Sequence, residues 1–79
     1  MRHVYVLHVW DGTNDNEGTV RVYADQIHAE KEAWFELDGV DQEACDFSVP
    51  EAMKLNGYIL HAVYGPNDAV VSVRKVPVR

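Results

Sequence analysis

Apolar and polar residues alternate over several short segments of the chain, a pattern typical of β-strands, whose successive side chains point to opposite faces. The segment 3–10, HVYVLHVW, is apolar at both parities, which predicts a central strand covered on both faces. The segment 18–23, GTVRVY, places Val20 and Val22 between less apolar neighbours and predicts a half-exposed strand.

Two further strands are predicted near the C-terminus. The segments 58–64, YILHAVY, and 69–76, AVVSVRKV, are separated by Gly65-Pro66-Asn67-Asp68, which are residues that favour a tight connection. We therefore expect an antiparallel hairpin. Pro77 is expected to end its second strand, because proline cannot donate to the ladder.

One short helix is predicted near residues 49–55. Ser48 and Glu51 have the spacing of a capping box, and Pro50 falls in the first turn, where its missing N–H costs nothing. Asn56-Gly57 then supplies a left-handed stop.

The segment 24–38, ADQIHAEKEAWFELD, fits two structures. A hairpin turning at residues 31–33 separates apolar from polar side chains and gathers on one face Gln26, His28, Glu30, Trp34, Glu36 and Asp38. A helix over 24–37 suits the content of alanine, glutamate and lysine but puts Lys31 within the apolar stripe. We take the hairpin as the main prediction and the helix as the alternative. A turn at Asp38-Gly39 and a strand near residues 44–47 follow.

A chain of 79 residues has room for one modest core, so residues 1–79 are predicted to form a single domain. The predicted fold class is mainly β (α+β): an antiparallel sheet of five to seven strands with one short helix near 49–55. The alternative is an α+β fold with a longer helix at 24–37.

The cysteine content and the apolar segments bear on the compartment. Cys45 is the one cysteine, which excludes an intrachain disulfide and argues for a reducing, cytoplasmic location. The longest apolar run, 4–10, is too short to span a bilayer, and no leader precedes the domain. We expect neither targeting nor membrane attachment.

The net charge of −6 is unevenly distributed. Residues 25–51 contain nine acidic residues and one lysine, which gives −8, so the remainder carries +2. Such a field repels nucleic acid and anionic lipid and attracts basic partners.

The loop WDGTNDNEGTV, residues 10–20, is rich in acidic residues, asparagine and glycine, but the calcium loop of an EF-hand needs glycine at position 6 and glutamate at position 12. Counting from Asp11 places Asn16 and Val22 there, and counting from Thr13 places Gly18 and Ala24. The loop is therefore predicted to be a turn. A small metal-binding domain using residues 11–17 is kept as an alternative function.

Other chemistry is weakly indicated. The histidines match no common zinc-ligand spacing, and the carboxylates of Glu43 and Asp46 disfavour a reactive thiolate at Cys45. No catalytic motif is present, so we expect neither an enzyme nor a cofactor. Only Arg74, Lys75 and Arg79 cluster as bases, which argues against direct nucleic-acid binding.

The acidic middle segment is the candidate site. Its carboxylates would resemble a run of phosphates and would complement a basic groove, while tryptophan is enriched at binding hot spots. The predicted partner-binding residues are Glu30, Trp34, Glu36, Asp38, Asp41 and Glu43. The competing interpretation is a solvated acidic face that only keeps the domain soluble.

The chain resembles small bacteriophage proteins, and among these the anti-CRISPR inhibitors, in its size, its acidity and its lack of catalytic motifs. The stretch VRVYADQIHAEKEAWFELDG is also similar to a hairpin of small phage proteins. This resemblance implies a viral protein that inhibits a host defence complex, a protein or ribonucleoprotein with a basic groove, through protein–protein interaction. It transfers no site residues. A structural or assembly module that self-associates through a sheet edge is the alternative.

Overall fold

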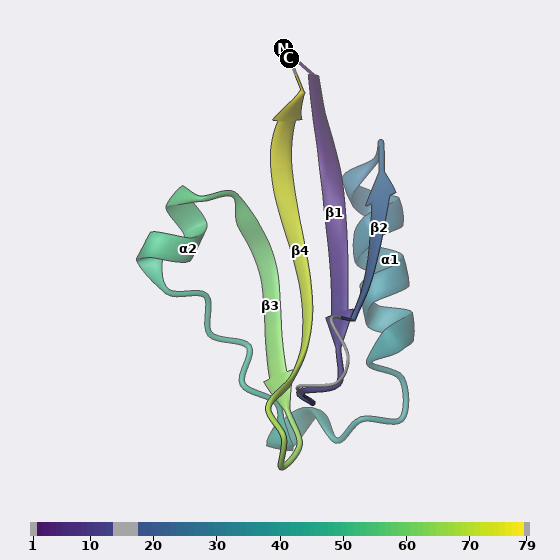
Figure 1. Ribbon diagram of the computed structural model, residues 1–79, viewed down its shortest axis with the longest axis vertical. Coiled ribbons are helices and arrows are strands. Elements are labelled where there is room, and N and C mark those ends of the chain that lie inside the picture. The colour runs from purple at the N-terminus through teal and green to yellow at the C-terminus, as the bar shows by residue number, and fades with distance from the viewer. Residues whose placement is uncertain (1, 14–17, 79) are drawn as a thin grey trace.

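The computed structural model describes residues 2–13 and 18–78, which form one antiparallel sheet with a helix on one face (Figure 1). The described strands are β1 (Arg2–Trp10), β2 (Thr19–Tyr23), β3 (Tyr58–Tyr64) and β4 (Ala69–Val78). Their order across the sheet is β2-β1-β4-β3, so the first and last strands of the chain pair at its centre. The four predicted strand segments are thus confirmed.

The number of strands and the end of β4 differ from the prediction. The described residues form a sheet of four strands, not five to seven, because residues 24–38 contribute no strand. β4 continues through Pro77, which pairs with His3. Beyond Arg74, β1 is the one described strand that pairs with β4, so the backbone nitrogen of Pro77, which has no N–H, can face the unpaired side of β4.

The predicted hairpin over 24–38 is wrong, and the alternative helix is present as α1 (Gln26–Glu36). Asp25 caps its N-terminus, with a side-chain oxygen accepting from the Ile27 N–H at 2.9 Å. At the other end, the Leu37 N–H donates to the Ala33 carbonyl at 3.1 Å. The local helix preference of alanine and glutamate therefore prevails over the alternation that favoured a hairpin.

The segment after α1 also differs from the expected strand. Residues Gln42–Ala44 form a short 3-10 turn, η1, and only Asp46 pairs with the sheet, through two backbone hydrogen bonds with Val63. This bridge anchors the connection along the β3 edge.

The short helix α2 (Glu51–Leu55) confirms the predicted helix with a later start. Ser48 does not cap it, because its amide and hydroxyl both donate to the Asp46 carboxylate. Gly57 ends the helix with φ +93, as predicted, and its carbonyl accepts from the Lys75 N–H at 2.8 Å. No helix in the described segments is long and apolar enough to cross a bilayer.

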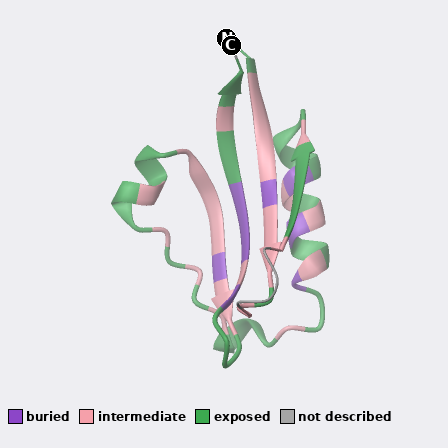
Figure 2. Cartoon of the chain, viewed as in Figure 1, coloured by how far each residue is buried: buried purple, intermediate pink, exposed green. Residues whose placement is uncertain are grey.

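The core lies between α1 and the sheet (Figure 2). Leu7 of β1 and Val71 and Val73 of β4 are buried there against Ala29 and Ala33 of α1. Because strand side chains alternate, the intervening residues of β1 and β4 point to the opposite face of the sheet.

Candidate binding surface

The side of α1 that faces the sheet carries small residues. Ala29 and Ala33 are both 0% exposed, and Leu37 continues the same row at the spacing of four residues. Alanine at these positions lets the helix backbone approach the strands closely. The helix thus packs on the sheet through small side chains, and its larger apolar side chains Ile27 and Phe35 take no part in the core.

Those larger side chains point to solvent. Ile27, Lys31 and Phe35 form a second row, about 200° around the axis from the buried row. Ile27 and Phe35 are each 74% exposed, and Trp34, on one flank, is 44% exposed. We call Ile27, Lys31, Trp34 and Phe35 the α1 outer face. Exposed large apolar side chains of this kind, here with Lys31 between them and other charged residues at the border, are typical of protein-binding sites.

Trp34 is partly fixed by the fold. Its ring lies 5.6 Å, centroid to centroid, from the ring of Phe47, which packs against the core. Glu30 precedes Trp34 by one helical turn and therefore shares its flank of α1. Of the six predicted site residues, the structure thus places Glu30 and Trp34 side by side.

Glu36 lies on the other flank of α1, about 120° around the axis from Glu30. The pKa of the Arg21 guanidinium on β2 is raised, chiefly by its hydrogen bond with Tyr23. Glu36 and Glu32 raise it further, which places both carboxylates on the β2 side. The predicted carboxylate array across two strands is therefore wrong, because a helix distributes these residues around its axis.

The remaining predicted residues follow α1. Asp38, Asp41 and Glu43 are exposed beyond its C-terminal end, and Asp41 accepts a hydrogen bond from the Glu43 N–H at 3.1 Å. The last turn of α1 contains no basic residue. Asp38 directly follows the C-cap of α1, where a carboxylate faces the negative end of the helix dipole and destabilises the helix by about 0.3–1 kcal/mol. Asp41 caps η1 through its hydrogen bond and Glu43 lies in the first turn of η1, so both have a local folding role there, which Asp38 does not share.

Three members of the α1 outer face, Ile27, Lys31 and Phe35, were missed from the sequence. The signal was present in the two rows of α1, since Ala29 and Ala33 alternate with Ile27, Lys31 and Phe35 at helical spacing.

No group of three or more metal-ligating side chains occurs in residues 2–13 and 18–78. In the loop considered for calcium, the Asp11 carboxylate accepts from the amide and the hydroxyl of Thr13, at 2.9 and 2.8 Å. Residues 14–17 of that loop lie outside the described residues. Cys45 is a free, half-buried thiol.

Comparison with known proteins gives no relative: the chain matches no family model, no curated protein and no solved structure. Its function is therefore inferred from the surface that the fold displays.

Proposed function

We propose that this protein is a binding module that docks the α1 outer face on a basic surface of a partner protein. The observation that carries the proposal is the inverted distribution of side chains on α1, with alanine toward the core and Ile27 and Phe35 toward solvent. Full burial of each such side chain is worth about 1.5–3 kcal/mol. A partner that covers this face supplies that burial.

The charge of the surroundings supports a basic partner. Glu30 lies on one flank of the outer face, Glu36 lies on the other, and Asp38 follows the helix end. Among the described residues, Glu32 contacts His28 at 3.7 Å, which is an ion pair only when His28 is protonated, and Glu30, Glu36 and Asp38 form no ion pair within 4 Å. These carboxylates around the α1 outer face raise the rate of association with a cationic surface and disfavour association with an anionic one.

We further propose a nucleic-acid-handling protein or ribonucleoprotein as the partner. The carboxylates around the α1 outer face, whose centre is apolar except for Lys31, offer a basic groove a substitute for phosphates, and occupation of that groove would inhibit its owner. An inhibitor of a host defence complex, the role implied by the resemblance to anti-CRISPR proteins, is the particular form of this proposal.

Affinity capture from bacterial lysate tests the proposed function. The parent protein should retain a basic, nucleic-acid-binding protein, and competing DNA or RNA should release it. Phe35→Ala should lose most of this capture. Leu55→Ala should not, because it removes an exposed apolar side chain of α2, which lies beyond the β3 edge of the sheet and away from α1 (Figure 1).

Charge reversal supplies a second arm of the same experiment. The triple variant Glu30→Lys, Glu36→Lys, Asp38→Lys should abolish capture, and added salt should weaken capture by the parent. Equal capture by the parent and by both the Phe35 and triple variants would exclude the α1 outer face as the site.

A second candidate function is self-assembly, which the β2 edge favours. β2 pairs only with β1 among the described strands, and both Val20 and Val22 are exposed on it. Antiparallel pairing with β2 of a second copy about Arg21 would set each valine opposite the other. Light scattering at micromolar concentration should then show a dimer that Val22→Lys dissociates, whereas a monomeric parent excludes this assembly.

A further inference from the structure

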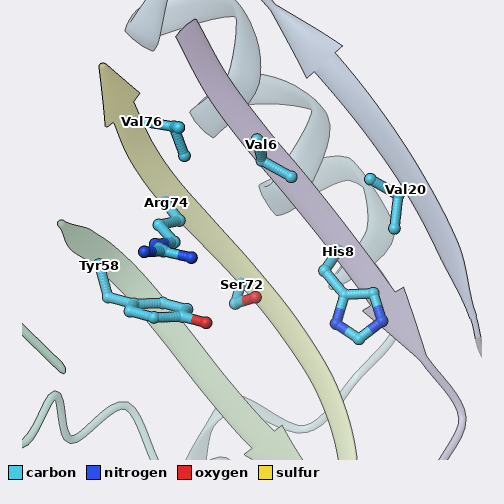
Figure 3. Close-up of a pocket in the computed structure, with 7 residues that line it drawn as sticks. All are labelled: Val6, His8, Val20, Tyr58, Ser72, Arg74 and Val76. Atoms are coloured by element: carbon cyan, nitrogen blue, oxygen red, sulfur yellow. The ribbon is translucent and has the colours of Figure 1, made fainter. Parts of the chain in front are cut away.

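The sheet face opposite α1 contains a hollow over its two central strands (Figure 3). Across this face, Ser72 of β4 lies between His8 of β1 and His61 of β3. Serine is the smallest side chain of that row, and Ser72 itself is buried. The larger neighbours therefore stand around a depression of about 300 Å³.

Arg74 lines this hollow in a fixed position. Its Nε donates to the carbonyl of Asn56 at 2.8 Å, and its guanidinium carbon lies 5.5 Å from the centroid of the Tyr58 ring. The bond to Asn56 uses one of five N–H donors, so the two terminal nitrogens keep theirs. No described carboxylate forms an ion pair with Arg74.

The polar groups around the hollow share one chemistry. In Figure 3 the hydroxyls of Ser72 and Tyr58 and the guanidinium of Arg74 converge on the same space. All three can donate hydrogen bonds, and a guanidinium binds carboxylate and phosphate with two parallel bonds. None of the described residues that line the hollow is acidic.

Apart from His8, the remaining walls are apolar. Val6 and Val76 stand beside Arg74, and Val20 closes the side toward β2 (Figure 3). Ligand sites of proteins commonly combine such walls with a few polar groups and begin at volumes of about 300 Å³. A bare inorganic ion would leave these valines without a partner.

We propose that this hollow binds a small organic anion, a phosphate monoester or carboxylate held by Arg74, Ser72 and Tyr58, with its apolar body against the valines. The site lies on the opposite face of the sheet from α1 and its carboxylates. It does not depend on the proposed function of the α1 outer face, so either proposal can fail without the other.

The test is an NMR titration of the full chain with phenyl phosphate and with benzoate. At least one of them should shift the amide resonances of Val6, Ser72 and Arg74 saturably, and the comparison identifies the preferred anion. Inorganic phosphate and phenol should each bind more weakly, because each lacks one half of the ligand. The absence of a saturable shift with both anions, or equal binding of either half alone, would overturn the proposal.

Variants locate the site. Arg74→Gln should weaken binding about tenfold or more, because it removes a charged donor. The matched control is Lys75→Gln, which makes the same charge change at the next position of β4, where the side chain points to the other face. If Arg74→Gln perturbs the spectrum of the free protein, Tyr58→Phe serves in its place and should weaken binding several-fold. Unchanged affinity in the variant used, or an equal loss in Lys75→Gln, contradicts the assignment.

Discussion

The rings of Trp34 and Phe47 lie against each other, with centroids 5.6 Å apart and planes inclined by 34°. This contact joins the flank of α1 to the connection that bridges to β3 through Asp46. Trp34 therefore contributes to folding and leaves 44% of its surface for a partner, whereas Phe35 is outside the core.

Trp34 and Phe35 are predicted to differ in their effect on stability. Trp34→Ala should lower the free energy of unfolding by about 1–2 kcal/mol, since it removes an aromatic pair and buried area. Phe35→Ala should change it by less than about 0.5 kcal/mol, as expected for an exposed site. Urea denaturation followed by circular dichroism measures both, and an equal loss in the two variants would place Phe35 in the core.

Asp38→Lys is predicted to stabilise the protein and weaken partner binding. The change replaces a carboxylate at the negative end of the α1 dipole with a cation and should raise the free energy of unfolding by about 0.3–1 kcal/mol. Glu51→Lys is the control, because Glu51 lies in the first turn of α2, where a carboxylate is favourable. Thermal unfolding should show opposite signs for the two variants. A destabilised Asp38→Lys protein would mean that this carboxylate has a folding role.

The strands were predictable from the sequence because their alternation is clear and their connections contain turn residues. β1 and the hairpin of β3 and β4 are examples. The helix α1 was not predictable in the same way. Its segment fits a strand period or a helix period, according to which of its apolar residues are taken as buried. Ala29 and Ala33 carry little hydrophobic signal in a sequence, yet they are the residues in contact with the core.

The candidate site was predictable only in part, for the same reason. Trp34 and the acidic composition could be recognised from residue type alone. The exposure of Phe35 depends on which side of α1 faces the sheet. This could not be recognised while the segment was predicted to be a hairpin. The hollow beside Arg74 depends on the register of β1, β3 and β4 across the sheet, and strand register between distant segments cannot be read from local pattern.

Asp46 predicts a loss of stability in acid. Hydrogen bonds from the hydroxyl and amide of Ser48 lower the pKa of its carboxyl below the usual value. A depressed carboxyl pKa stabilises the fold above the unfolded-state pKa of about 3.9, and this contribution is lost as the pH falls through the folded-state value.

Ser48→Ala tests this dependence, because it removes the hydroxyl that contributes most to the shift. Urea midpoints of the parent and the variant should differ near neutral pH and converge as the pH falls below about 4. A difference that is constant across this range would show that Ser48 acts by some means other than the ionisation of Asp46.

Gly57 is predicted to be essential to the β3–β4 edge. A Cβ at this position would lie 2.3 Å from the Lys75 carbonyl oxygen, and its φ of +93 is itself unfavourable for other residues. Gly39 has a similar φ of +86 but open space around it, so Gly39→Ala isolates the backbone cost of about 1–2 kcal/mol. Gly57→Ala should cost more in chemical denaturation and should also weaken anion binding, since the neighbouring Asn56 carbonyl orients Arg74. An equal loss of stability in Gly57→Ala and Gly39→Ala would mean that β4 moves away from the added methyl group without strain.

Site-specific photocrosslinking tests the binding role of the α1 outer face most directly. Benzoylphenylalanine is placed at position 35 in one protein and, as a control, at the exposed Leu55 position of α2 in another. In bacterial lysate, position 35 should crosslink to a basic, nucleic-acid-handling protein that position 55 does not reach. No crosslink from position 35, or the same products from both positions, would contradict a partner seated on this face.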